Sequence, residues 1–173
     1  MMKFRLFGGR RVLPVERRPE LDREERVLAW APVGEDDTVV ATNLGLWWGG
    51  TRTGWHRIDK AVWDGEHLVV TPAELVAERA GYDVIADGTP VRLRLADPDH
   101  VPHQVRLRVT GSVRHPQHYE LPGGGVWVFA RRVPGADGLA WAVRYDQGTD
   151  GDDPAVVAAT DQLVAQSQGD AVA

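Results

Sequence analysis

The chain of 173 residues contains no cysteine. Without a thiol it has no disulfide, no thiolate zinc site and no cysteine nucleophile. It also lacks the run of about 18 apolar residues that a membrane-spanning helix needs. Its basic first segment, Met1–Arg11, is not followed by an apolar stretch of signal-peptide length. We therefore expect a cytoplasmic protein with no membrane-spanning segment. The length fits one domain that can form a stable core without disulfide bonds.

Lysine is nearly absent, because only Lys3 and Lys60 of the 20 basic residues are lysine and the other 18 are arginine. This bias is typical of a high-GC genome of the actinobacterial type. The charge is also uneven. Residues 1–18 hold six basic side chains and one acid, whereas residues 146–173 hold six aspartates and no base. Such ends are typical of solvated tails, although a basic arm can also contact a nucleic acid or a membrane surface.

Short apolar runs separated by turn residues follow one another through most of the chain, which predicts a mainly β protein. We expect residues 26–168 to form a single domain of seven or eight antiparallel strands, arranged as a bent sheet or a partly open barrel. Residues 1–25 are expected to be a basic N-terminal arm and connector, and residues 169–173 a tail.

One C-terminal helix is expected to close the β domain. Asp152 or Asp153 suits its N-cap and Pro154 its first residue. Apolar residues then recur at helical spacing, so the helix is predicted over residues 154–168. Residues 72–79 leave two alternatives, which are two helical turns behind Pro72 or an irregular strand edge.

Residues 91–95 and 105–114 alternate between aliphatic side chains and arginine. Such alternation predicts two strands with one buried and one solvated face, here paired as a hairpin. Four arginines would share its outer face, where like charges are unfavourable unless acids or an anion intervene. The candidate anion-binding residues are Arg92, Arg94, Arg106 and Arg108. The alternative is a solvated face with nearby acids as partners.

Trp47 is the candidate interface residue. In the run 38–48 the core face is expected to contain Val40, Leu44 and Leu46, and Trp47 has the opposite parity. Tryptophan is enriched at binding hot spots. The alternative is that Trp47 packs beneath a loop.

Four histidines have the spacing of metal ligands, with His100 near His103 and His115 near His118. The predicted strand between the pairs would separate them by roughly 35 Å, so we expect no metal site. Residues 123–125 are three glycines that precede a strand and lack the context of a phosphate-binding loop.

Ser112 and Ser167 are the only serines, and neither stands in a nucleophile-elbow sequence. We therefore expect no catalytic residue, no cofactor and no enzyme activity. The alternative is an enzyme whose pocket the sequence does not reveal.

Four segments carry a family resemblance. They are Val39-Val40-Ala41-Thr42-Asn43-Leu44-Gly45-Leu46, Trp55-His56-Arg57-Ile58-Asp59, Val62-Trp63-Asp64-Gly65 and Leu68-Val69-Val70. Their succession resembles the bacterial and GRAM-like branches of the pleckstrin-homology family. The shared pattern is an apolar strand ending in Thr-Asn before a leucine, a short loop, an aromatic with isoleucine three residues on, and a hairpin. This resemblance covers about a quarter of the chain and implies a bent sheet closed by a C-terminal helix.

The resemblance implies a binding or scaffold module more readily than an enzyme. Relatives that hold inositol phosphates use basic residues around the first β-hairpin, whereas residues 34–37 here are Gly-Glu-Asp-Asp. That acidic turn would repel a phosphorylated headgroup, so a phosphoinositide is not expected. We expect a protein partner or self-association. The alternative is an anion or nucleic-acid contact protein that uses the four arginines and the basic arm.

Overall fold

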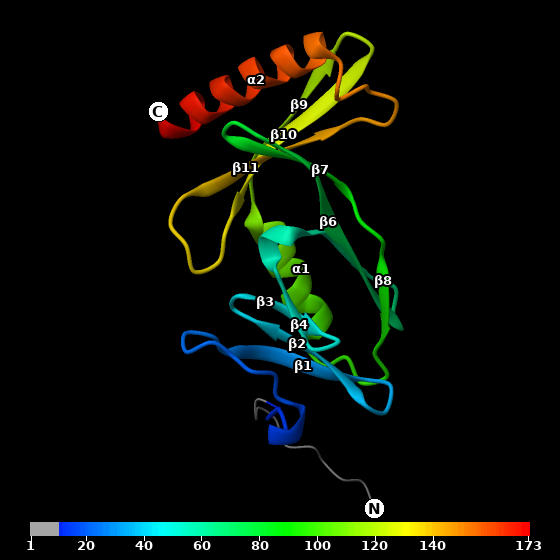
Figure 1. The fold of residues 1–173 in the computed structure, drawn as a ribbon. Coiled ribbons are helices and arrows are strands. Elements are labelled where there is room, and N and C mark those ends of the chain that lie inside the picture. Colours follow the sequence, from blue (N-terminus) through cyan, green and yellow to red (C-terminus); the bar gives the residue numbers. More distant parts are fainter. Residues whose placement is uncertain (1–10) are drawn as a thin grey trace, which may run out of the picture.

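The computed structural model describes residues 11–173 and confirms a mainly β chain. Within those residues the strands form one sheet of four and one of seven, accompanied by two α-helices. Figure 1 shows an elongated molecule with the four-stranded sheet toward its N-terminal end and the C-terminal helix α2 (Pro154–Val172) at the other end. No helix in the described part is both long and apolar enough to cross a membrane.

The first sheet is an antiparallel meander in the order β1-β2-β3-β4. Its strands are β1 (Val27–Val33), β2 (Asp37–Thr42), β3 (Gly45–Trp48) and β4 (Thr51–Gly54). Gly34, at a φ of +62°, supplies the left-handed conformation of the turn between β1 and β2. The turn after β4 is the short 3-10 helix η2 (Trp55–Arg57), which leads the chain into the second sheet.

The second sheet has the order β5-β6-β7-β11-β10-β9, with β8 paired to β6 beside that path. Its strands are β5 (Ile58–Trp63), β6 (His67–Arg79), β7 (Tyr82–Asp87), β8 (Val91–Arg94), β9 (Val113–Leu121), β10 (Gly124–Arg132) and β11 (Leu139–Tyr145). The β7–β11 pair is parallel, with Val84 opposite Val143. The expectation of a wholly antiparallel array is therefore wrong. The long connection over residues 88–138 allows the two strands to run in the same direction.

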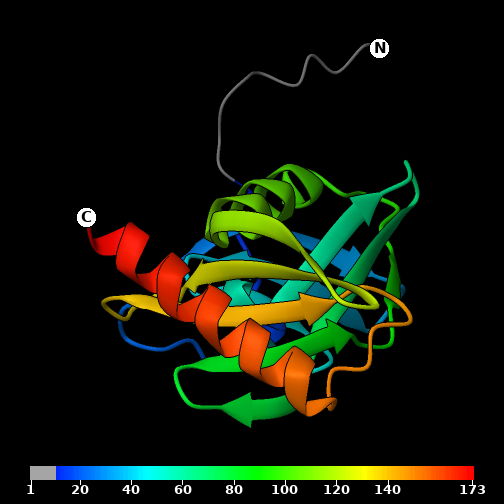
Figure 2. The same cartoon turned by 90° about the horizontal axis from the view of Figure 1, so that it is seen from above.

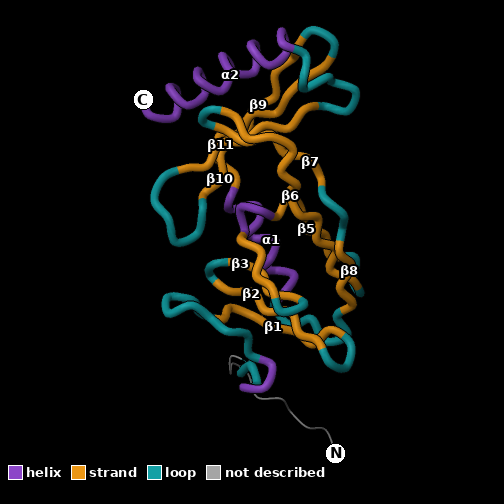
Figure 3. Tube along the Cα trace, viewed as in Figure 1, coloured by secondary structure: helices purple, strands orange, loops and turns teal. Residues whose placement is uncertain are grey.

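Strand β6 runs through both halves of the second sheet. Its first half pairs with β5 and β8, and its second half pairs with β7. The partner changes at Pro72, and a bulge between Leu75 and Ala77 bends the second half. Figure 3 shows this strand running from the level of β5 to that of β7. Residues 72–79 are therefore strand, and the alternative of two helical turns is wrong.

Helix α1 (Val101–Ser112) occupies the segment that the alternation assigned to a strand. The predicted hairpin of residues 91–95 with 105–114 is wrong. Val101, Val105 and Val109 are buried at a spacing of four residues, whereas Leu107 is 53% exposed. Valines at every fourth position satisfy both the helical period and the period of two, and Pro102 suits the first turn of a helix.

Helix α2 confirms the predicted C-terminal helix and continues beyond residue 168 to Val172. Asp153 is the N-cap, because its carboxylate accepts hydrogen bonds from the backbone N–H groups of Ala155 and Val156. Val156, Thr160 and Val164 form the buried stripe.

The apolar interior is divided into two main clusters. One lies among the first sheet, α1 and the strands β5, β6 and β8, and the other lies between α2 and the strands β7, β9, β10 and β11. We call these parts the α1 unit and the α2 unit, with the two halves of β6 belonging to one unit each. Figure 2 shows α2 lying across the strands of its own unit. The expectation that one helix closes the whole array is wrong, because each unit has its own.

Residues 11–25 lie against the first sheet. Leu13 is buried with Trp30 and Val40. Arg17, in the short 3-10 helix η1 (Val15–Arg17), donates hydrogen bonds to the backbone oxygens of Glu35 and Asp37. This described part of the connector is therefore held to the β1–β2 turn.

Candidate anion-binding site

The four arginines singled out from the sequence do not share one face. Arg92 and Arg94 lie on β8, and Arg106 and Arg108 lie on α1. The side chains of Leu93 and Leu95 enter the core beside α1, so the arginines that alternate with them point away from the helix. Each of the two strand arginines has an acidic partner. Arg92 lies 3.4 Å from Asp64, and Arg94 lies 2.9 Å from Glu66.

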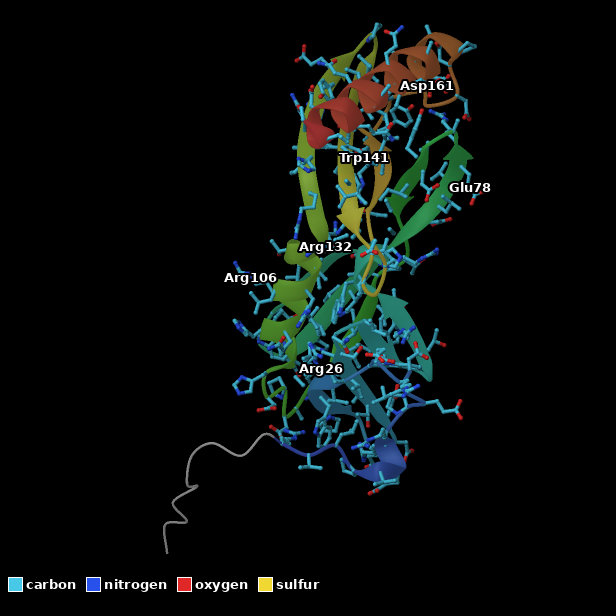
Figure 4. All side chains as sticks on the ribbon, turned by 90° about the vertical axis from the view of Figure 1, so that its left-hand side faces the viewer. Arg26, Glu78, Arg106, Arg132, Trp141 and Asp161 are labelled. Atoms are coloured by element: carbon cyan, nitrogen blue, oxygen red, sulfur yellow. The ribbon has the colours of Figure 1, made fainter. Side chains whose placement is uncertain are left out.

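Arg108 lines a groove of about 830 Å³ beside α1. We call it the α1 groove. Its walls come from five parts of the chain. These are the residues just before β1, the β2–β3 turn, the start of η2, α1 with the start of β9, and the end of β10 with the following loop. The lining includes four arginines and four apolar residues, which are Arg26, Arg108, Arg114 and Arg132 with Leu44, Trp55, Leu107 and Pro134. Figure 4 looks onto this face, with Arg132 and Arg26 on either side of the middle of the molecule and Arg106 at the outer side of α1.

The charge of the α1 groove is strongly positive. Within the part of the chain that the structure describes, four arginines line it, and Glu24 is the only acid in the lining. Arg26, Arg108 and Arg132 make no ion pair within the described residues. Arg114 is engaged at the end of α1, where it donates to the backbone oxygens of Gly111 at 2.5 Å and Val113 at 2.9 Å. Three guanidinium groups are thus free to bind an anion.

The floor of the groove is apolar. Trp55 is only 2% exposed, and its indole N–H donates to the backbone oxygen of Thr42 at 2.9 Å. Leu44, Leu107 and Pro134 complete the apolar surface. A few charged groups placed around an apolar floor are typical of small-ligand sites.

A buried cluster of charges joins the groove to the contact between the two units. Arg131 donates to Ser112 Oγ at 2.8 Å, and Ser112 lines the groove. Arg131 also lies 3.4 Å from Asp59 Oδ1, with both side chains less than 10% exposed. Arg144 pairs with Asp59 as well, and with Asp87 at 3.1 Å. Strands of both units therefore meet in one ionic network.

Burial and hydrogen bonding shift the pKa values of the groups in this network. Burial raises the pKa of Asp59, while Arg144 lowers it and neighbouring Asp87 raises it further. Hydrogen bonding to Asp59 holds the pKa of Asp87 below its ordinary value. Burial also lowers the pKa of Arg131. Because the carboxylates and guanidiniums are paired with one another, we interpret the network as a structural joint between the units.

Trp47 is half-buried, and its polar end is occupied. Its indole N–H donates to Glu25 Oε1 at 2.8 Å, and the Arg52 guanidinium lies 5.7 Å from its ring centre. Burial alone would raise the pKa of Glu25, but hydrogen bonds from Thr42, Trp47 and the backbone of Asp22 lower it. A protein interface or self-association through Trp47 stays a prediction.

The histidines are placed differently from the sequence-based expectation. His100 and His103 stand at the start of α1, and His115 and His118 stand on β9. His118 hydrogen bonds Asp146 at 2.8 Å. Among the described residues no group of three or more His, Cys, Asp or Glu side chains could hold a metal ion.

Sequence reasoning found one arginine of the groove, Arg108, and missed Arg26, Arg114 and Arg132. Each lies at the edge of an element, and nothing in its local sequence marks it as a ligand-binding residue. Comparisons of the chain with protein-family models, with curated proteins and with solved structures find no match.

Proposed function

We propose that this protein is a non-enzymatic binding module that holds an anionic ligand in the α1 groove. One observation carries the proposal. Arg26, Arg108 and Arg132 come from three separate parts of the chain and line one cavity with an apolar floor, and none of them has an acidic partner in the described residues. Like charges gathered without partners are unfavourable, and an anion that bridges them removes that cost.

We also propose that the α1 unit is pleckstrin-homology-like, which keeps the family resemblance in a revised form. Four antiparallel strands are followed by β5, β6, β7 and β8 and then by α1, and β7 pairs within the α2 unit. On this proposal α1 takes the role that the sequence interpretation gave to α2, and the α2 unit is an addition. The acidic turn at residues 34–37 is exposed, and the proposed ligand binds elsewhere, in the α1 groove.

The test uses 8-anilinonaphthalene-1-sulfonate, whose sulfonate suits the arginines and whose rings suit the floor formed by Leu44 and Leu107. We expect saturable fluorescence enhancement at low salt that weakens severalfold in Arg132→Gln and in Arg26→Gln. Arg92→Gln is the matched control, because it removes the same charge from β8, where the side chain points away from the groove.

Thermal unfolding of each variant checks that the fold is intact. Equal dye affinity in the parent, Arg132→Gln and Arg26→Gln would contradict the proposal. So would an equal loss in Arg92→Gln, since that would indicate a response to net charge alone.

A further inference from the structure

A second cavity adjoins the α1 groove. This cavity, of about 620 Å³, lies at the start of α1 and is lined by Arg11, Arg18 and His100 together with Val27 and Leu28 of β1. Gln104 lines both cavities, and Arg26 of the groove directly precedes Val27. The two cavities therefore adjoin at Gln104, and together we call them the α1–β1 seam.

The α1–β1 seam is basic at both ends. Arg18 is exposed and has no ion pair among the described residues, and Arg11 pairs with Asp97 at 2.8 Å at the rim. The start of α1 adds the positive end of a helix dipole, because its N-cap His100 makes no side-chain capping bond and its first turn contains no acid. Asp99 and Glu24 are the acids that line the seam.

The length of the seam suits a chain-like ligand. Helix α1 has 12 residues and spans about 18 Å. Arg18 lies at the end near the start of the helix, and Arg132 at the end near Ser112. One small anion cannot reach both, whereas a linear chain of negative charges can neutralise arginines along the whole length.

The lining of the seam also bears on whether nucleic-acid bases could be recognised. Among residues 11–173, Trp55 is the only indole or phenyl ring that lines either cavity, and it is 2% exposed. Proteins that hold the bases of a single strand stack them on exposed aromatic rings. The described lining of the seam therefore offers charges to a ligand and no exposed ring on which a base could stack.

We propose that the α1–β1 seam binds a linear chain of phosphate groups, as found in the backbone of single-stranded nucleic acid and in inorganic polyphosphate. The proposal rests on the proposed function, because the α1 groove is one end of the seam. It adds that the ligand extends to Arg18 and that affinity depends on ligand length.

The experiment measures fluorescence anisotropy of labelled oligothymidylates of about 4, 8 and 16 residues, the range of site sizes known for single-strand binding folds. We expect affinity to rise with length at low salt until both ends of the seam are occupied. For single strands each phosphate contact contributes about −0.7 to the slope of log K against log salt. Removal of one contact should then weaken binding about eightfold near 50 mM salt.

Arg18→Gln and Arg132→Gln should each weaken binding of the longest oligomer by about that factor and make the slope shallower by about 0.7. Arg92→Gln, the matched control on β8, should leave both quantities unchanged. Arg18→Gln should also leave binding of the sulfonate dye unchanged. Unlabelled polyphosphate separates the two sources. Competition at equal phosphate concentration indicates recognition of the phosphate chain in general, and failure to compete indicates a nucleic-acid backbone.

Two results would overturn the inference. One is an affinity that does not change with oligomer length, and the other is an Arg18→Gln variant that binds the longest oligomer like the parent. Either result, combined with dye binding that depends on Arg132, would leave the proposed function of the α1 groove standing. Loss of the Arg132-dependent dye binding would remove both.

Discussion

Tyr82 and Tyr145 tie α2 to its sheet through their hydroxyl groups. Tyr82 donates to Asp161 Oδ1 on α2 at 2.6 Å, and the hydroxyl groups of Tyr145 and Thr160 lie 2.8 Å apart. Arg79 donates to Tyr145 at 2.8 Å and to the backbone oxygen of Gly151 at 2.7 Å. Burial, followed by the bond to Asp161, raises the pKa of Tyr82 to about 12. The phenol is therefore held in its neutral form in the folded protein.

This raised pKa predicts that stability falls in alkali. The unfolded tyrosine ionises near pH 10, whereas the folded one ionises near pH 12. The contribution of Tyr82 is therefore complete below about pH 10 and is lost as the pH rises toward about 12. Tyr82→Phe should cost about 1–2 kcal/mol at neutral pH and make the alkaline decline shallower.

Urea denaturation at several pH values between about 8 and 11 measures both effects. Tyr119→Phe is the control, because its hydroxyl is 3.3 Å from that of Ser167 and no aspartate accepts from it. An alkaline decline as steep in Tyr82→Phe as in the parent would show that another group causes it.

At the scale of the elements, the residues of α1 can be interpreted as a helix or as a strand, and the two interpretations differ in which side chains are buried. As a helix it buries Val105 fully and leaves Leu107 53% exposed. A strand with alternating faces would bury both. Val105→Ala should therefore cost about 2 kcal/mol of unfolding free energy, whereas Leu107→Ala should change it by less than about 0.5 kcal/mol. Chemical denaturation of the two variants tests this contrast, and equal losses would support the strand.

The sequence predicts some elements better than others. The cap at Asp153 and the stripe of Val156, Thr160 and Val164 identify α2 because only a helix satisfies both. Val101, Val105 and Val109 do not identify α1 in the same way, because they fit two periods. The parallel β7–β11 pair could not be predicted either, since no local pattern records which distant strands meet.

The candidate site was harder to predict than the strands. Its lining residues lie within 24–26, 43–44, 104–114 and 132–135, together with Trp55. Their proximity depends on where α1 packs. The strand interpretation of α1 therefore places Arg106 and Arg108 beside Arg92 and Arg94. It gives no indication of the residues that surround Arg108 in the structure.

At the scale of the whole molecule, the two units are joined by β6 and by the ion pairs around Asp59. This carboxylate is 8% exposed and contacts both Arg131 and Arg144. Asp59→Ala would leave guanidinium groups at the joint without that partner. Removal of one partner of a buried ion pair typically costs about 3–5 kcal/mol, so we expect a loss of about 3 kcal/mol.

Lys60→Ala is the matched control for Asp59→Ala. Its ammonium lies 3.1 Å from Asp87, but both side chains are well exposed, and we expect a change of less than about 1 kcal/mol. Differential scanning calorimetry measures both variants. An Asp59→Ala protein as stable as the parent would show that the network contributes nothing to the joint.

Because β7 pairs with the distant strand β11, one edge of β7 stays unpaired while the chain is being synthesised. A ribosome makes the chain from its N-terminus, so β7 leaves the exit tunnel well before residues 139–145 exist. Until β11 arrives, one edge of β7 has no neighbour, and the bulged end of β6 exposes Leu75 and Val76 next to it. Unpaired edges are templates for association with other chains. The nascent protein is therefore most open to misassembly between the emergence of β7 and the arrival of β11, and α1 with one wall of the α1 groove is made between these two strands.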